Sequence, residues 1–190
     1  VHYASLRHFT GAGKFVDSYQ EDETTDFHTM VSEMADIPRK QAKTINLGLF
    51  YGMGKGKLMS QLGVNLETAS ELLASYNERV PFVKQLMNDT MNKAGKKGYL
   101  STLEGRRCRF DQWEPTNEWG QKSLPLAEAQ QQYGEHMIKR AWTYKALNRL
   151  IQGSAADQTK KAMLELDKEG YLAHIQVHDE LDFSVASDAD

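Results

Sequence analysis

Two cationic side chains, Arg39 and Lys43, stand four residues apart in a stretch that begins with a proline and ends at a glycine. Such ends are typical of a helix, here expected over residues 38–51. Positions four apart drift by only about 40° around a helix, so Leu47 and Tyr51 continue the same stripe for roughly 18 Å. This order predicts a nucleotide site, in which the cations contact the phosphates of a nucleoside triphosphate and the next two side chains contact its sugar and base.

The cations on this stretch also have a simpler explanation, because two cations at this spacing are more often a solvated helix end that runs into a core stripe. The glycine-rich stretch 52–57 adds no phosphate loop. Its spacing to Gly-Lys is one residue short, and Leu58 stands where Ser or Thr is required. We interpret it as a helix cap and turn.

Adjacent carboxylates, Asp179 and Glu180, occupy the short turn of a predicted hairpin near the end of the chain. The hairpin is indicated by apolar residues that alternate with polar ones on both sides, at Ile175, Val177, Leu181, Phe183 and Val185. Acidic hairpin turns are common without any function. Cys108 is the lone cysteine and no Cys/His spacing resembles a zinc site, so a metal bound here would be held by carboxylates.

Two amide side chains, Asn148 and Gln152, stand one helical turn apart and are followed by the small residues 153–156. Purine N3 and pyrimidine O2 atoms lie at equivalent places in the minor groove of every base pair, and amide donors suit them. An Asn/Gln pair taken alone is more often structural. The pair therefore permits an interface with duplex DNA without requiring one.

Taken together, these motifs resemble those of DNA polymerase family A, the DNA polymerase I family. The resemblance rests on Asp-x-His at 26–28, Arg-x3-Lys-x7-Tyr-Gly at 39–52, Thr-Leu-x-Gly-Arg-Arg at 102–107, Asn-x3-Gln-Gly-Ser-Ala-Ala-Asp at 148–157 and His-Asp-Glu at 178–180. It runs from Val1 to about Val185 and is weakest between Gln112 and Trp142. The chain is identified as a fragment of such an enzyme, with a phage as the expected source.

The resemblance implies roles for individual residues. Nucleotide contacts are implied for His28, Arg39, Lys43, Leu47 and Tyr51, and DNA contacts for Gly52, Arg106, Arg107, Asn148, Gln152 and His178. Catalysis is implied for Asp179, Glu180 and Lys43, with Asp179 as a metal ligand and two Mg²⁺ ions expected in the complete enzyme. Arg106 and Arg107 would bind either backbone phosphates or the frame of the nucleotide-binding part.

Two positions depart from the family pattern. Leu47 stands where most members have an aromatic residue, and Tyr144 stands where cellular members often have an arginine. The first change alters the surface offered to the nucleotide. The second puts one duplex contact in doubt.

The implied activity is template-directed DNA synthesis, in which deoxynucleoside triphosphates are added to a primer 3′-OH by two-metal nucleotidyl transfer. Primer-template DNA and deoxynucleoside triphosphates are the implied partners, with no membrane and with processivity or replisome partners left open. In the family, the first catalytic aspartate precedes a pair similar to Val1-His2. The fragment is therefore expected to lack this aspartate and to be inactive alone.

Single residues distinguish this function from two alternatives. Glu180 favours a DNA polymerase over the related single-subunit phage RNA polymerases, which typically carry serine there. A non-catalytic nucleic-acid-binding module is the other alternative, but Lys43 and Asp179 are both present.

Positioning these residues requires a mainly helical body with a small antiparallel β element, an α+β fold. Helices are predicted over 27–34, 38–51, 56–62, 66–79, 81–94, 126–150 and 154–168, and short strands over 99–103 and 108–110. By resemblance to a right-hand polymerase, residues 1–15 would be a palm remnant, 16–147 mainly fingers and 148–190 palm. No repeat or low-complexity linker divides the chain, so a single partial polymerase domain is expected.

The charge of the chain is small in sum but uneven along its length. The formal net charge is -3, yet residues 16–38 carry seven acids and no Lys or Arg, and residues 39–66 carry five cations and no acid. Because polyanion binding depends on where charge lies, a small net charge does not exclude nucleic acid. No apolar run approaches the roughly 20 residues needed to cross a membrane, and a cytoplasmic location, the host cytoplasm for a phage protein, is expected.

Overall fold

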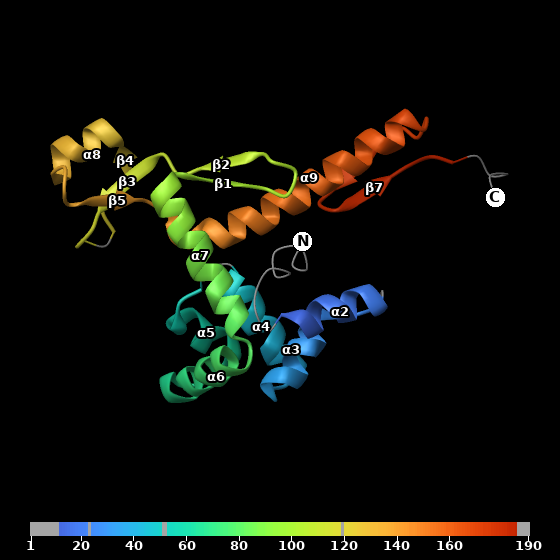
Figure 1. Ribbon diagram of the computed structural model, residues 1–190, viewed down its shortest axis with the longest axis horizontal. Helices are drawn as coiled ribbons and strands as arrows, with labels where there is room; N and C mark the ends of the chain where they lie inside the picture. Colours follow the sequence, from blue (N-terminus) through green and yellow to red (C-terminus); the bar gives the residue numbers. More distant parts are fainter. Residues whose placement is uncertain (1–11, 23, 51–52, 119, 186–190) are drawn as a thin grey trace.

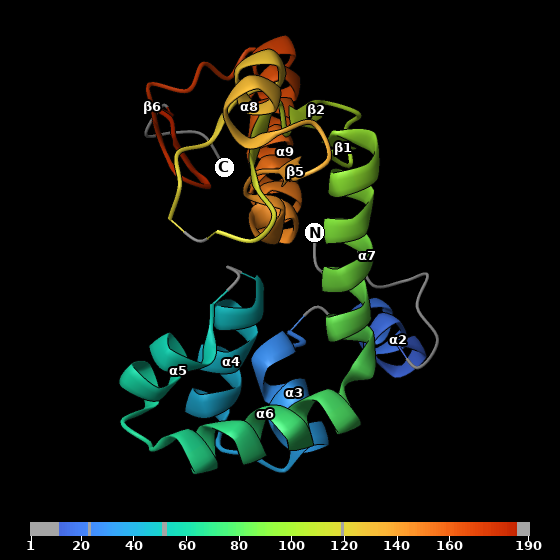
Figure 2. The same cartoon turned by 90° about the vertical axis from the view of Figure 1, so that its left-hand side faces the viewer.

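The computed structural model of the chain describes residues 12–22, 24–50, 53–118 and 120–185. Helix α7 (Pro81–Lys97) runs between two groups of elements, as Figures 1 and 2 show. The first group comprises α2 (Gly13–Glu21), α3 (Phe27–Ala35), α4 (Arg39–Phe50), α5 (Lys55–Leu62) and α6 (Leu66–Arg79). We call it the lower lobe, after its place in the figures.

The second group, the upper lobe, contains the strands and the longest helix. Its elements are β1 (Tyr99–Ser101), β2 (Arg107–Arg109), β3 (Gln112–Pro115), β4 (Leu124–Pro125), α8 (Leu126–Tyr133), β5 (Ile138–Arg140), the 3₁₀ turn η1 (Thr143–Lys145), α9 (Ala146–Lys168), β6 (Ile175–Val177) and β7 (Glu180–Asp182). The strands form three small antiparallel sheets in the part of the chain that is described: β1-β2, β4-β3-β5 and β6-β7. The predicted α+β class is confirmed.

Helix boundaries follow local capping chemistry. The side chain of Asn65 accepts a hydrogen bond from the backbone N–H of Thr68 at 2.8 Å, so α6 begins directly after it, as predicted. Helix α7 has Pro81 in its first turn and ends at Gly98, whose φ of 76° is favourable for glycine. Within the described residues, no helix is long and apolar enough to cross a membrane.

The main hydrophobic core lies in the lower lobe and includes two residues from α9. The fully buried side chains around it come from α3, α4, α6 and α7, among them Val31, Ile45, Tyr76, Phe82 and Val83. Leu147 and Ile151 of α9 join this core, while Ala146 joins a smaller cluster with Leu100 and Phe110. The N-terminal end of α9 therefore packs into both lobes.

The predicted helix over 126–150 is wrong. Helix α8 ends at Tyr133, and Gly134 follows with a φ of 88°, a left-handed conformation that glycine adopts easily. The chain then forms β5, which pairs with β3 in a register that sets Trp113 opposite Arg140. The predicted start of a separate helix at residue 154 is also wrong, because α9 continues through Gly153.

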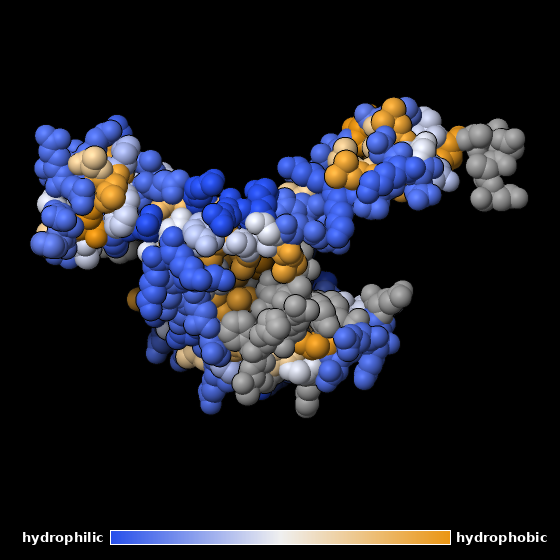
Figure 3. Space-filling view, turned by 45° about the horizontal axis from the view of Figure 1, so that its top comes forward, coloured by the Kyte–Doolittle hydropathy of each residue, from blue (hydrophilic) through white to orange (hydrophobic). Residues whose placement is uncertain are grey.

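Large apolar side chains are exposed at the far end of α9 and on the hairpin β6–β7. Figure 3 shows orange apolar atoms gathered at this end of the molecule. The residues concerned are Leu164, Tyr171, Leu172, Ile175 and Val177, all at least 49% exposed.

The packing of α9 into the core generates a stability prediction. Leu147→Ala should lower the free energy of unfolding by about 2–4 kcal/mol, because it removes buried apolar contacts and leaves a cavity. Leu164→Ala on the same helix is the matched control, since that side chain is 62% exposed, and it should cost less than about 0.5 kcal/mol. Urea denaturation followed by circular dichroism measures both, and equal losses would contradict the packing described.

Candidate functional site

Helix α4 exposes the stripe that its sequence predicts. Arg39, Lys43 and Leu47 are exposed, whereas Ala42 and Ile45 on the other side are fully buried in the core. The proposed nucleotide contact Tyr51 and the proposed DNA contact Gly52 lie outside the described residues and stay predictions. The described part of α4 thus presents two cations and one apolar side chain on a single surface.

The side chain of Arg39 is oriented by polar groups at the N-terminal end of α3. Its Nε donates to Asp26 Oδ2 at 2.8 Å and lies 3.1 Å from Thr29 Oγ1. No hydrogen bond from its two Nη groups is found among the residues that the structure describes. The outer edge of the guanidinium is therefore oriented and available for a bidentate phosphate contact.

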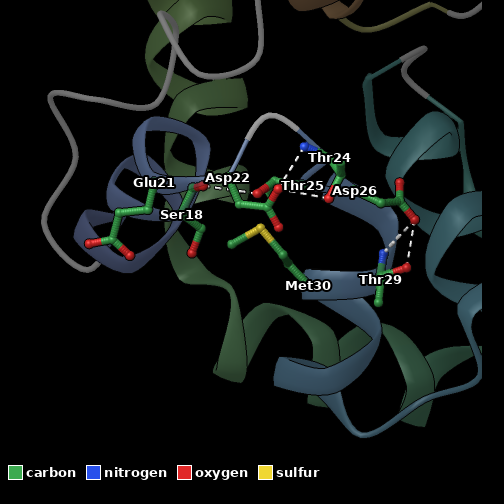
Figure 4. Close-up of a pocket in the computed structure, with 8 residues that line it drawn as sticks. All are labelled: Ser18, Glu21, Asp22, Thr24, Thr25, Asp26, Thr29 and Met30. Carbon is green, nitrogen blue, oxygen red and sulfur yellow. Dashed lines mark hydrogen bonds between the residues drawn. The ribbon is translucent and has the colours of Figure 1, made fainter.

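Asp26 is the residue that links α3 to Arg39, as Figure 4 shows for its contacts with Thr29. Its carboxylate caps α3 by accepting hydrogen bonds from the backbone N–H groups of His28 and Thr29, each at 3.2 Å. The Thr29 hydroxyl, at 2.6 Å, is the largest cause that lowers the pKa of Asp26, and Arg39 lowers it further.

A cavity lies beside Asp26 at the start of α3. It has a volume of about 440 Å³ and is lined by Ser18, Glu21, Asp22, Thr24, Thr25, Asp26, Thr29 and Met30 (Figure 4). The Asp22 carboxylate in it accepts two hydrogen bonds from Thr24, which lower its pKa. In the described part of the chain, no group of three His, Cys, Asp or Glu side chains is placed to hold a metal.

His28 is half-buried on α3 and faces α4. Its Nδ1 lies 3.2 Å from Asn46 Nδ2, and no hydrogen-bond partner of its Nε2 is found among the described residues. Burial is the main cause that lowers the pKa of His28; the charges of Lys43 and Arg39 lower it further, against the opposing effect of Asp26. These effects disfavour the charged form of His28, which lies near the cationic stripe.

The carboxylate Asp179 lies at a two-residue turn, as the sequence predicts. Strands β6 and β7 pair with Val177 opposite Glu180, so His178 and Asp179 alone form the connection. His178 has a left-handed φ of 52°, and its carbonyl accepts a hydrogen bond from Gln176 Nε2 at 2.8 Å. Both turn side chains and Glu180 are exposed.

The register shows that the apolar residues of this hairpin do not share one face. Directly paired residues project to the same side, so Ile175 and Val177 lie with Asp182 and Glu180. Leu181, on β7, pairs with Gln176 and projects to the other side. The alternation predicted within each strand is therefore correct, but the apolar residues of β6 and those of β7 project to opposite faces of the hairpin.

The hairpin tip and α9 enclose a cavity of about 400 Å³. Its lining consists of Gln152, Ala155, Ala156, Thr159, His178 and Asp179. The structure thus brings together three residues that the sequence places in DNA binding and metal binding. Asn148 lies one turn earlier on α9 and is half-buried, with an Oδ1 that is buried without a partner in the described chain.

Arg106 packs on another side of α9, with the β1–β2 hairpin. Its Nε forms an ion pair with Asp157 Oδ1 at 2.7 Å, and its Nη2 donates to the Gly153 carbonyl at 3.0 Å. A Cβ added at Gly153 would lie 3.1 Å from both Arg106 Nη2 and Thr102 Cγ2. Hydrogen bonds from Thr102 and then Arg106 lower the pKa of Asp157. These contacts join Arg106 to α9, and the choice between its two predicted roles stays a prediction.

Arg107 is exposed, as Arg106 is, but it has no ion pair in the described residues. Its guanidinium carbon lies 4.8 Å from the centre of the Tyr99 ring, which orients the side chain without neutralising its charge. Arg107 therefore remains available to a phosphate.

Comparisons with known proteins agree with this arrangement. The sequence profile of DNA polymerase family A matches residues 5–189. A "DNA-directed DNA polymerase" of Pseudomonas phage M6 is 36% identical over 97% of this chain and 31% of that protein, and "DNA polymerase I" of Mycobacterium bovis is 32% identical over 95% and 20%. The chain belongs to DNA polymerase family A.

A solved structure also resembles the whole described fold. It is the "POL domain of Pol1 from M. smegmatis complex with DNA primer-template and dNTP", which superposes with a TM-score of 0.70 and 29% identity. The match covers 98% of this chain and 31% of that one. The chain thus spans about a third or less of the length of these relatives.

The Asp26 contacts predict a pH-dependent stability. Because the folded-state pKa of Asp26 lies below its unfolded value of about 3.9, its contribution is complete above that pH and is lost as the pH falls. Asp26→Ala should therefore cost about 1 kcal/mol at pH 7, with the difference from wild type shrinking below about pH 4. Denaturant titrations across this range test it. Asp89→Ala, at an exposed carboxylate on α7, is the control for the substitution and should cost less than about 0.5 kcal/mol at pH 7.

Proposed function

We propose that these 190 residues form the fingers and part of the palm of a template-directed DNA polymerase. In this proposal residues 16–147 are mainly fingers, residues 148–190 belong to the palm, and residues 1–15 are a palm remnant. The observation that carries the proposal is the pair of surfaces described above. One chain of family A presents a cationic stripe on α4 and a cavity that joins Gln152, His178 and Asp179.

The stripe suits a deoxynucleoside triphosphate. Arg39 is fixed by Asp26 and offers the planar edge of its guanidinium, whereas Lys43 has no partner among the described residues and can follow the charge of the phosphates. Charge on the transferred phosphate grows during transfer, so Lys43 would stabilise the transition state more than the ground state. Leu47 would pack its aliphatic side chain against the sugar, and this side chain offers neither an aromatic ring nor a hydroxyl group.

The cavity between α9 and the hairpin suits the primer end of a duplex. Gln152 offers an amide next to Ala155 and Ala156, whose small side chains permit a close approach to the minor groove. His178 would contact the primer backbone, and Arg107 a phosphate farther away. Support for these partners comes from the M. smegmatis structure, whose name records primer-template and dNTP.

The residues present fit Mg²⁺ in part. Asp179 is an exposed carboxylate held at the end of paired strands, and hard oxygen ligands of this kind suit Mg²⁺. Bound Mg²⁺ would supply the positive charge that activates the primer hydroxyl and neutralises the triphosphate. Asp179 would be its ligand, and Glu180 an acid beside the primer end. Further ligands would come from the triphosphate and from a second carboxylate outside the described residues.

The role of Asp179 is tested in the longer polymerase that carries this segment. Asp179→Ala should reduce primer extension by more than tenfold while leaving primer-template affinity nearly unchanged, because the acid serves the metal rather than DNA binding. Asp182→Ala, in the same hairpin, is the control and should retain activity. Extension by Asp179→Ala at more than about a tenth of the wild-type rate would refute the assignment.

The stripe on α4 is tested with a matched pair of lysines. Lys43→Ala should lower kcat/KM for a deoxynucleoside triphosphate by about 30- to 1,000-fold, which corresponds to about 2–4 kcal/mol. Lys40 is also exposed on α4 but lies off the stripe, so Lys40→Ala should change kcat/KM by less than about threefold. Equal losses of kcat/KM in the two variants would contradict a specific phosphate contact by Lys43, because they would show only the effect of removing one positive charge from α4.

A further inference from the structure

Two polar side chains are completely buried behind His28. Asn46 on α4 and Tyr76 on α6 each have 0% exposure, and the Tyr76 hydroxyl donates a hydrogen bond to Asn46 Oδ1. Asn46 Nδ2 in turn lies 3.2 Å from His28 Nδ1. We call these contacts the Tyr76–Asn46–His28 network. It joins three helices of the lower lobe and ends at the cationic stripe.

The direction of this network is fixed at its buried end. Burial raises the pKa of Tyr76, so its hydroxyl keeps its proton, and a buried hydroxyl without an acceptor would be costly. Asn46 Oδ1 is the one acceptor found for it among the described residues. The Asn46 amide must therefore point its oxygen toward Tyr76 and its nitrogen toward His28.

The orientation of Asn46 determines the state of the imidazole. An amide nitrogen only donates, so the contact at 3.2 Å requires a lone pair on His28 Nδ1. In a neutral imidazole the proton then resides on Nε2. The other tautomer and the imidazolium both carry a proton on Nδ1, which would place one donor against another.

We propose that Asn46 and Tyr76 are positioning residues that hold His28 as the neutral Nε2–H tautomer, which donates to a phosphate oxygen of a nucleotide bound along Arg39 and Lys43. The phosphate contact rests on the proposed function, whereas the tautomer does not. A donor set in this way binds phosphate without taking up a proton from water.

The charged groups near His28 act in both directions. Asp26 favours protonation, whereas Lys43 and Arg39 oppose it, and burial opposes it most strongly. Protonation of Nδ1 would also set its N–H against the N–H of Asn46, and this unfavourable contact further opposes the charged form. His28 should therefore remain neutral through the physiological range.

Nitrogen NMR on the 190-residue chain tests the tautomer without any nucleotide. Wild type should show an unprotonated Nδ1 and a protonated Nε2 in His28. Asn46→Asp replaces the donor with an acceptor, so it should move the proton to Nδ1 and raise the titration midpoint of His28 by about one pH unit or more. A protonated Nδ1 in the wild type would overturn the proposal.

Tyr76→Phe is the second variant, because it removes one hydroxyl and keeps the ring in the core. Without that hydroxyl the Asn46 amide can reverse, so the NMR signals should show a mixture of tautomers and a raised midpoint. Tyr171→Phe, at an exposed ring, controls for the substitution and should leave the His28 signals unchanged. If Tyr76→Phe folds and its His28 signals match the wild type, the positioning role is refuted, even where Asn46→Asp does not fold.

Kinetics in the longer polymerase separate the tautomer from the phosphate contact. Tyr76→Phe should lower kcat/KM for a deoxynucleoside triphosphate by about 3- to 10-fold, and the loss should change with pH as His28 titrates. Altered NMR signals with unchanged kinetics would overturn the phosphate contact. Retained activity in Asp179→Ala would instead count against the proposed function and leave the NMR result intact.

Discussion

The arrangement of the molecule depends on the burial of one end of α9 in the core of the lower lobe. Leu147 and Ile151 pack with side chains from α4, α6 and α7, while the next turns of the same helix line the cavity at the hairpin. An α-helix rises about 1.5 Å per residue, so the distance from the core to Thr159 is set by a rigid rod of roughly 18 Å. The cationic stripe on α4 shares that core through Ile45. The two candidate surfaces are therefore positioned relative to each other by the same packed side chains.

A second constraint fixes the β1–β2 hairpin to α9. The Arg106–Asp157 ion pair is half exposed on the arginine side, so its Coulombic contribution to stability is modest. Its geometric effect is larger, because Arg106 also binds the Gly153 carbonyl, and Ser154 Oγ accepts from the Leu103 backbone at 3.1 Å. This explains why small residues recur on α9: those facing the hairpin admit its backbone and arginine, while Ala155 and Ala156 keep the opposite cavity open.

Local signals predicted those parts of the fold that local chemistry controls. Asn65 caps α6 and the four-residue spacing on α4 sets its exposed stripe, and both act within a few turns of helix. The failure at 126–150 came from strong helix formers such as Leu126 and Ala146, which gave no sign that Gly134 and the pairing of β3 with β5 would divide the segment. The Tyr76–Asn46–His28 network was missed because its members stand up to 48 positions apart in the sequence and meet only through tertiary packing. An asparagine between apolar positions of a buried helix face was the one available signal.

The candidate site divides its residues into those proposed to contact substrate and those that hold them in place. Arg39 is oriented by Asp26 and Thr29, His28 by Asn46 and Tyr76, and Asp179 by the pairing of β6 with β7. Such support lowers the conformational entropy lost on binding and limits each group to one geometry. Lys43 differs, since no polar partner holds it among the described residues. A flexible ammonium next to a fixed guanidinium and a fixed imidazole can follow a phosphate as charge moves during transfer, so the absence of support for Lys43 suits the role proposed for it.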